Sequence, residues 1–241
     1  MLSTARKEAA RTLGYKIASE LSSLAMGKAR IVVEVEPFTI KGSAPDASLP
    51  PSFEREEDDA LVVELEGGAR ALLTRTGIDR VELMIAPNPG EEPRPLRRIA
   101  SGGELSRALL AVKRVLARTG PAGIYVFDEV DAGVGGAVAE AIGRKIADVA
   151  KHHQVLCITH LPQIAAFADV HFAVEKREEA GRTVSEVRRV DGKARVEEIA
   201  RMLGGATITK ATRAAADEMI TAARPPSRIS KGVVGAAKGL R

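Results

Sequence analysis

Two adjacent carboxylates end an apolar run in the middle of the chain. The segment GIYVFDEVD, residues 123–131, has the pattern of a buried strand in a parallel sheet, and it carries Asp128 and Glu129 near its end. In α/β sheets, ligands bind at the carboxyl ends of such strands. Because adjacent strand residues point to opposite faces, one carboxylate can hold Mg²⁺ while the other activates water, as phosphate hydrolysis requires. Taken alone, the pair fits the solvated end of a core strand better than a catalytic site.

A turn and a histidine extend this candidate site. Asp131 is followed by the glycine-rich stretch GVGG, residues 133–136, which predicts a tight turn where a partner can approach the backbone. A second apolar strand, residues 154–159, ends at His160. If the two strands are neighbours, His160 reaches the same sheet edge as the carboxylates, where an imidazole can hydrogen-bond a phosphate or orient a water. The alternative for a single histidine is a local hydrogen bond.

The segment SGGELSR, residues 101–107, precedes an amphipathic helix. Glycine is a poor helix former, so two glycines at a helix start indicate that backbone N–H groups are left open to an anion such as a phosphate. The Ser101 hydroxyl can add a hydrogen bond. The alternative is that a loop ends here and Ser101 caps the helix. The apolar face expected for this helix consists of Leu105, Leu109, Val112 and Leu116.

The remaining elements are expected to position these residues. Residues 1–24 have helical spacing, and strands are expected at 29–37, 60–67 and 80–90, so the first ninety residues predict antiparallel strands carrying one long helix. Farther along, strands and helices alternate, which favours an α/β fold with a parallel sheet and flanking helices. The further helices are expected at 136–150, 161–168, 195–203 and 207–223, with a hairpin joining 170–176 to 183–190.

Composition limits the classes of protein. One cysteine in 241 residues excludes an internal disulfide and a four-cysteine zinc site, and it fits a reducing compartment. The net charge of +4 is too small to indicate nucleic-acid binding by itself. Because no apolar run approaches the ~18 residues of a membrane span, we expect no membrane contact and a cytoplasmic location. A Pro-rich acidic loop is expected at 46–59 and a disordered basic tail at 224–241.

Taken in order, these motifs resemble the ATP-binding-cassette ATPases. Within that superfamily the segments APNPGEEPRPLRRIASGGELSRALLAVK, FDEVDAGVGG, ITHLPQIAAFAD and ARMLGG resemble the RecN family, the bacterial SMC-like DNA repair proteins. The resemblance covers residues 1 to about 223. It implies that residues 1–28 are the end of a coiled-coil arm and that 29–223 form the C-terminal lobe of an ATPase head.

The resemblance also implies roles for the site residues. Asp128 would hold Mg²⁺ through water, and Glu129 would be the general base that polarises the attacking water. Asp131 would be the D-loop carboxylate at the interface between two heads, and His160 the switch residue near the γ-phosphate. The signature motif would consist of Ser101, Gly102, Gly103 and Glu104, which contact ATP held by the opposite head of a homodimer.

One motif of the resembled family is missing from this chain. The phosphate loop G-x-x-x-x-G-K-[ST] does not occur in the sequence. In the resembled family it lies in an N-terminal lobe, which would be a separate partner here. The complete protein of that family binds DNA and is associated with the nucleoid. The chain is therefore expected to be a fragment, a split-gene product or a remnant. Alone, it is expected to bind ATP weakly, not to hydrolyse it, and to expose apolar surface where the other lobe pairs. The alternative function is a non-catalytic interaction module that pairs with a lobe carrying the phosphate loop.

Overall fold

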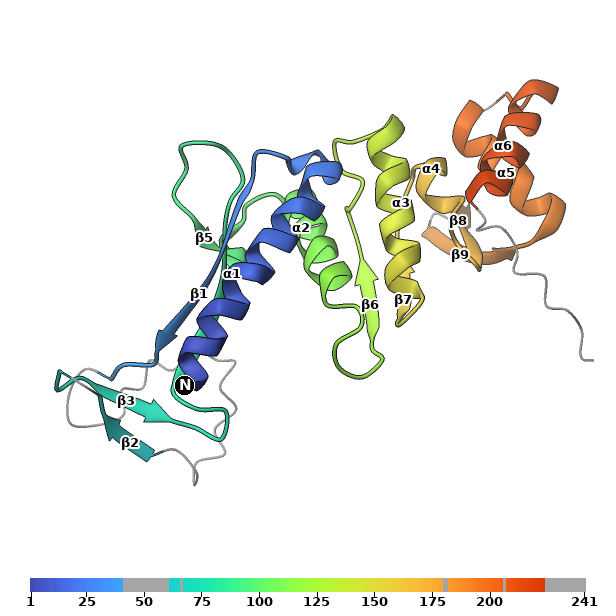
Figure 1. Ribbon diagram of the computed structural model, residues 1–241. Helices are drawn as coiled ribbons and strands as arrows, with labels where there is room; N and C mark the ends of the chain where they lie inside the picture. Colours follow the sequence, from blue (N-terminus) through green and yellow to red (C-terminus); the bar gives the residue numbers. More distant parts are fainter. Residues whose placement is uncertain (41–60, 66, 180–181, 206, 224–241) are drawn as a thin grey trace, which may run out of the picture. The chain divides into compact units, whose positions relative to one another are not determined.

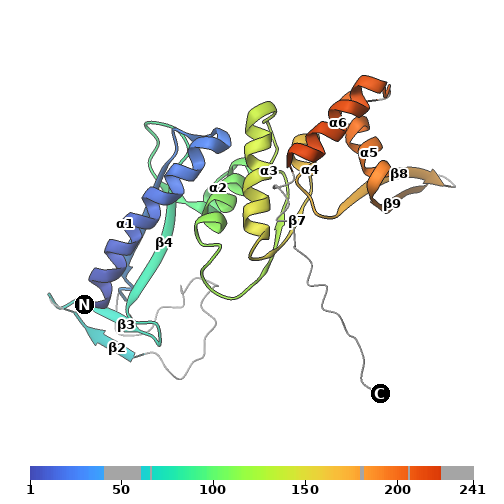
Figure 2. The same cartoon turned by 45° about the vertical axis from the view of Figure 1, so that its right-hand side comes forward.

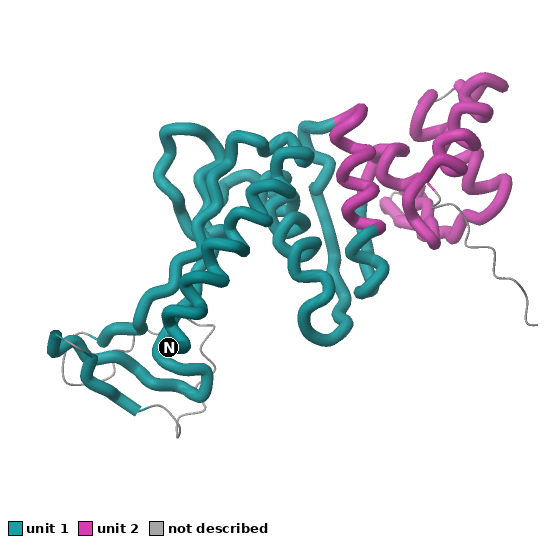
Figure 3. Tube along the Cα trace, viewed as in Figure 1, with its two compact units in different colours: residues 1–134, 148–158 teal, residues 135–147, 159–241 magenta. Residues whose placement is uncertain are grey.

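A computed structural model describes residues 1–40, 61–65, 67–179, 182–205 and 207–223. The chain divides into two compact units (Figure 3). Unit 1 comprises residues 1–134 and 148–158, and unit 2 comprises residues 135–147 and 159–241. The acidic loop and the basic tail expected from the sequence lie outside the described residues.

A long helix on an antiparallel sheet opens unit 1. Helix α1 spans Leu2–Leu21 and passes into a π-helical turn at Ser22–Met26. Strand β1 (Arg30–Pro37) pairs antiparallel with β4 (Asp79–Ala86), and β5 (Arg94–Pro95) pairs with β4. Helix α1 lies along β1 (Figures 1 and 2). The expected helix with antiparallel strands is confirmed.

The buried face of α1 follows from helical spacing. Ala10, Gly14, Ile17 and Leu21 are buried, three or four residues apart, so they share one side of the helix. The helix passes close to β1 at Gly14, where a Cβ would lie in ordinary van der Waals contact, 3.5 Å from the carbonyl oxygen of Ile31. At the other end of α1, Arg6 forms an ion pair of 2.9 Å with Asp79 of β4. The helix is therefore fixed to the sheet along its length.

A small hairpin in unit 1 differs from expectation. Strand β2 (Leu61–Glu64) was predicted, but its antiparallel partner β3 (Arg70–Leu73) was not. The β3 segment RALL has no β-branched residue, so its sequence gives little strand signal. Gly67 and Gly68 both have positive φ, and they form the turn that brings β3 back onto β2.

The site-bearing part of unit 1 contains one helix and two strands. Helix α2 spans Gly102–Val115, and β6 (Ile124–Phe127) pairs parallel with β7 (Gln154–Cys157). The expected parallel pairing is confirmed. The expectation that both strands are buried is wrong, because one face of the pair is exposed. This bare face consists of Ile124, Val126, Leu156 and Ile158, which are 70%, 61%, 53% and 55% exposed.

The buried side of α2 also differs from the expected one. Leu109 was expected in the core but is 38% exposed, and Leu105 and Leu116 are half-buried. Helix α2 instead buries a neighbouring stripe that packs toward α1 and toward the turn after β6. That stripe contains Gly103, Arg107, Ala108, Leu110, Ala111 and Val112.

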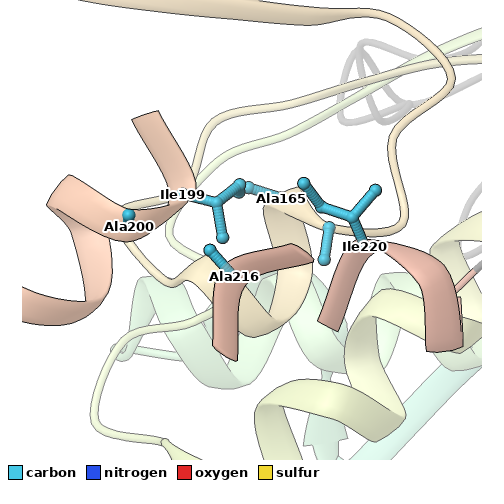
Figure 4. Packing of buried hydrophobic residues seen from close by; sticks show 6 residues of the cluster. Ala165, Ile199, Ala200, Ala216 and Ile220 are labelled. Carbon is cyan, nitrogen blue, oxygen red and sulfur yellow. The ribbon is translucent and has the colours of Figure 1, made fainter. Parts of the chain in front are cut away.

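Unit 2 is built around three helices. Helices α4 (Pro162–Ala165), α5 (Gly192–Gly204) and α6 (Lys210–Ala223) enclose a small apolar cluster (Figure 4). Ile199 is fully buried there, beside Ile220. Gly205 has a φ of +66°, a conformation that ends α5 and that glycine adopts readily. The expected pair of helices around a glycine break is confirmed.

A helix and a hairpin complete the described residues. Helix α3 spans Gly136–Ala150, as predicted, with residues 136–147 in unit 2. Strands β8 (His171–Glu179) and β9 (Arg182–Val190) form the expected hairpin, with longer strands than predicted. Within the described residues, no helix combines the length and apolar character needed to cross a membrane.

Candidate functional site

The two predicted carboxylates lie in the turn that follows β6. Asp128 and Glu129 are both exposed. Asp128 Oδ1 accepts a 2.9 Å hydrogen bond from the backbone N–H of Glu129, and the Glu129 carbonyl accepts one of 3.0 Å from Ala132. Glu129 has a φ of +56°, a left-handed conformation that costs about 1 kcal/mol in a residue with a side chain. Backbone strain of this kind concentrates at functional sites.

The start of α2 carries the second predicted element. Ser101 is the N-cap, and its Oγ accepts a 3.4 Å hydrogen bond from the backbone N–H of Glu104. This confirms the capping role. Gly102 and Gly103 occupy the first turn, where backbone N–H groups have no partner within the helix. The Ser101 hydroxyl still has its proton to donate, so capping leaves the predicted anion-binding role open.

The structure brings the helix start and the carboxylate turn together. A Cβ at Gly102 would collide with the carboxylate of Glu129. A Cβ at Gly103 would lie 2.8 Å from the Cβ of Ala132 and 3.2 Å from the carbonyl oxygen of Glu129. Gly103 is therefore needed for the backbone of α2 to lie directly against the turn, whereas the flexible Glu129 side chain could move away from a Cβ at Gly102. A negative carboxylate beside a helix N-terminus is also electrostatically favourable.

Asp131 and His160 differ in exposure, and only Asp131 is less open than the sequence suggested. Asp131 is only 4% exposed, so its carboxylate is not presented to solvent in this chain. His160 is exposed and belongs to unit 2. The Oγ1 of Thr159 accepts a 3.0 Å hydrogen bond from the N–H of Leu161, just before α4 begins. The approach of His160 to the carboxylates stays a prediction, as does a role for Asp131 between heads.

The donor set suits a metal held together with phosphates. Among the described residues, no three His, Cys, Asp or Glu side chains cluster closely enough to hold a metal. Asp128 offers one exposed carboxylate, and Mg²⁺ bound with nucleotides usually takes one or two carboxylates, with water and phosphate oxygens completing its shell. Asp128 therefore fits Mg²⁺ carried in with a nucleotide.

The sequence reasoning missed two side chains beside the site. Ser106 Oγ donates a 2.7 Å hydrogen bond to the carbonyl oxygen of Asp128, and Arg107 Nη1 donates one of 2.9 Å to the carbonyl oxygen of Ala132. Their signal was present in the segment SGGELSR, since both residues follow the glycines by one helical turn. The apolar spacing of the helix does not indicate either contact.

His153 supports the strands that carry the site. His153 Nδ1 accepts a 3.1 Å hydrogen bond from the N–H of Gly123, and Nε2 lies 2.9 Å from the carbonyl oxygen of Ala117. These bonds connect the loop before β6 to the start of β7.

Burial raises the pKa of the Cys157 thiol to about 12, with the charges of Asp131 and Asp128 acting in the same direction. Cys157 is therefore a neutral thiol and not a nucleophile.

The helix start, the carboxylate turn and the parallel pair are all present in the structure. They match what the resemblance to the SMC-like ATP-binding-cassette ATPases predicted for the C-terminal lobe of a head. No known family profile matches the sequence.

Comparison with known proteins makes the assignment more specific. The chain is 43% identical over 223 residues to the DNA repair protein RecN of Streptomyces coelicolor, a match that covers 92% of this chain and 36% of that protein. It is 42% identical to RecN of Mycobacterium leprae and 39% identical to RecN of Bacillus subtilis, over 92% and 91% of this chain. The chain belongs to the RecN family and corresponds to the C-terminal portion of its members. It spans about a third of their length.

Solved structures with a related arrangement are SMC heads. A head domain with coiled coil from Pyrococcus yayanosii has a TM-score of 0.46 and 19% identity, covering 78% of this chain and 28% of that one. The SMC head bound to the C-terminal winged-helix domain of ScpA has a TM-score of 0.41 and 20% identity, covering 76% of this chain and 44% of that one.

Proposed function

We propose that this chain is the C-terminal part of a RecN-like ATPase that acts in recombinational repair of DNA double-strand breaks. The observation that carries the proposal is the packing of the α2 start against the Asp128–Glu129 turn. This places open backbone N–H groups beside two carboxylates at the end of a parallel strand. Family membership supports the same function, since the curated relatives are DNA repair proteins.

In this function each site residue has a different role toward Mg²⁺–ATP. Asp128 would hold Mg²⁺ through water, and the metal would neutralise the negative charge of the ATP phosphates. Glu129 takes a proton from the attacking water, as a general base. His160 serves as the switch residue near the γ-phosphate, and Asp131 is the D-loop carboxylate at the boundary between two heads.

The helix start serves a different nucleotide from the carboxylates. Ser101, Gly102, Gly103 and Glu104 contact the γ-phosphate of ATP held by the opposite head of a homodimer. Backbone N–H groups at a helix N-terminus bind phosphate without needing a cationic side chain. ATP would then join two heads, and the complete protein would use that engagement to hold DNA in the bacterial cytoplasm, at the nucleoid.

The bare face of β6 and β7 supports an N-terminal lobe as the direct partner. Parallel sheets are covered on both faces in stable proteins, yet Val126 and Leu156 are 61% and 53% exposed here. The relatives are nearly three times as long as the matched region, so they contain sequence enough for a second lobe. That lobe would also supply the phosphate loop that this sequence lacks.

The bare face equally favours a second candidate function. An apolar face of this kind requires a covering partner whether or not ATP is hydrolysed. In the second function the chain supplies the Ser101–Glu104 segment and a dimer surface to a separate nucleotide-binding chain, without turnover. The two functions differ in whether Glu129 is required.

The test uses this chain mixed with the part of Streptomyces coelicolor RecN that precedes the matched region, hereafter the N-terminal lobe. We expect ATP hydrolysis by the mixture, and a loss of about 10²–10⁴-fold with Glu129→Gln, because the general base is removed. Glu140→Gln is the matched control, since Glu140 is an exposed residue of α3 that pairs with Arg144. Turnover unaffected by Glu129→Gln would contradict the proposed roles, and association without turnover would favour the interaction module.

A further inference from the structure

Arg107 is a buried cation in the middle of an otherwise small and apolar helix face. Its residue exposure is 7%, and it lies one turn after Gly103 on α2. Side chains on a helix point back toward its N-terminus, which carries the guanidinium over the first turn. Burial lowers the pKa of Arg107, and the nearby carboxylate of Glu104 opposes that change. A cation buried in this way is destabilising unless its hydrogen bonds repay the loss of water.

The hydrogen bond of Arg107 goes to backbone in the carboxylate turn. Its Nη1 lies 2.9 Å from the carbonyl oxygen of Ala132, three residues after Glu129. The same nitrogen would lie 3.2 Å from a Cβ at Gly103. The absent side chain of Gly103 therefore leaves space for both the guanidinium and the Cβ of Ala132. Arg107 and Gly103 form one packing unit against the turn.

Ser106 fixes the other end of the same turn. Its Oγ donates a 2.7 Å hydrogen bond to the carbonyl oxygen of Asp128. Adjacent residues of α2 thus bond to carbonyl oxygens on the two sides of Glu129. Because the left-handed conformation of Glu129 is unfavourable, the surrounding contacts must hold it in place. The bonds from Ser106 and Arg107 do this from the helix side.

We propose that Arg107, assisted by Ser106, is a positioning residue that couples the two nucleotide sites of the head dimer. This inference rests on the proposed function. There, Glu129 acts on nucleotide in its own head, while the Ser101–Glu104 segment of the same chain contacts nucleotide in the opposite head. The link through Arg107 joins these two segments rigidly. A phosphate seated on the α2 start of one head therefore orders the general base that serves the other site.

The contact itself can be tested in this chain without any partner. Hydrogen–deuterium exchange of residues 128–134 reports how firmly the turn is held, since Ala132 and Val134 donate backbone hydrogen bonds within it. We expect Arg107→Met to speed exchange there about tenfold, the equivalent of one lost hydrogen bond of ~1.4 kcal/mol. Arg114→Met is the matched control, because Arg114 lies on the same helix but pairs with Glu20 and Asp148. Unchanged exchange in Arg107→Met overturns the positioning role.

The coupling is tested in the mixture with the N-terminal lobe. The proposed head dimer has two nucleotide sites, so coupling between them should give the ATP dependence of hydrolysis a Hill coefficient of about 1–2. We expect this coefficient to fall to about 1 with Arg107→Met. Arg107→Lys should restore part of the cooperativity, because an ammonium group can still donate to the carbonyl of Ala132. Ser106→Ala, which removes only a hydroxyl, provides a second variant that tests the link if Arg107→Met does not fold.

The outcomes separate this inference from the proposed function. A Hill coefficient of about 1 in the unsubstituted mixture, or one that Arg107→Met and Ser106→Ala leave unchanged, overturns the coupling while leaving the function standing. Absence of Glu129-dependent hydrolysis overturns the proposed function, and the coupling with it. The exchange experiment still decides in that case whether Arg107 holds the turn.

Discussion

The β6–β7 pair of unit 1 and the α4–α5–α6 cluster of unit 2 use the same kinds of aliphatic residue with opposite results. In the cluster Ile199 is fully buried, whereas Val126 in the strand pair is 61% exposed. Helices that are close in sequence can cover one another, but a parallel strand pair needs a layer on each face. The incomplete region also carries Asp128 and Glu129. The candidate site therefore lies in the region that we propose a partner completes.

The largest expected effect comes from placing a charge on the bare face. Leu156→Arg should weaken association with the N-terminal lobe at least a hundredfold, because docking would bury an unpaired cation at a cost of about 3–5 kcal/mol. Val174→Arg is the control, since Val174 is 62% exposed on the β8 strand of unit 2. Sedimentation of the mixed chains measures the affinity. Equal weakening by both substitutions would break the comparison between the two regions.

A pair of truncations compares the closed and open regions directly. Ile199→Ala should lower the free energy of unfolding by about 2–5 kcal/mol, because it leaves a cavity in the cluster. Val126→Ala should change it by no more than about 0.5 kcal/mol in the isolated chain, because little packing is lost at an exposed site. Urea denaturation measures both. Similar losses would mean that the bare face is already covered within this chain.

A glycine pair tests the close approach of α2 to the carboxylate turn. Gly103→Ala should destabilise unit 1 by about 1–3 kcal/mol, because its Cβ would overlap that of Ala132. A Cβ at Gly135 meets nothing within 4 Å, so Gly135→Ala is the control and should have little effect. Thermal unfolding of the two variants gives the difference. An equally stable Gly103→Ala chain would show that the helix and turn are not in close contact.

The smallest expected effect is a pH dependence confined to unit 2. Burial lowers the pKa of His171 below 6.5, and Arg195 acts in the same direction, while Glu198 opposes it. As the pH falls, the unfolded chain therefore binds a proton at His171 before the folded chain does. The free energy of unfolding should decrease as the pH drops from 6.5 toward the lowered pKa, and it should be fully present above 6.5. Stability decreases toward low pH because the folded state favours the neutral His171 ring.

A second group titrates in a separate window and serves as the comparison. A hydrogen bond from Arg201 lowers the pKa of Glu198 below 4.5, so its contribution is present above 4.5 and is lost only as the pH falls further. His171→Gln should flatten the stability profile just below 6.5, and Glu198→Gln should change it below 4.5. Denaturation curves across this range measure the slopes. A slope below 6.5 that survives His171→Gln would contradict this assignment.

Local patterns predicted much of the fold. The segment 136–150 has clear helical spacing with no interrupting proline, and α3 has those bounds. Ser101 before two glycines predicted a helix start, and its side chain caps α2. The apolar runs that became β6 and β7 predicted parallel pairing. In the first two cases the residues that determine the structure are close together in the sequence, and the third rests on the apolar pattern within each strand.

Burial could not be predicted in the same way. The apolar residues of β6 and β7 indicate strands that are covered in the complete protein, but a sequence pattern does not say which chain supplies the cover. Arg107 was missed because its bond to Ala132 joins residues 25 apart, and no spacing rule within a helix reveals such a contact. The left-handed conformation of Glu129 likewise has no signal in the residues around it, because a non-glycine residue seldom adopts it.

The central claim is that this chain is one part of an ATPase head and becomes active only when the other part is present. The most direct measurement compares ATP hydrolysis by this chain alone, by the N-terminal lobe alone and by their equimolar mixture. We expect a rate in the mixture well above the sum of the separate rates, with none from this chain alone. Steady hydrolysis by this chain alone, lost with Glu129→Gln, would contradict the account.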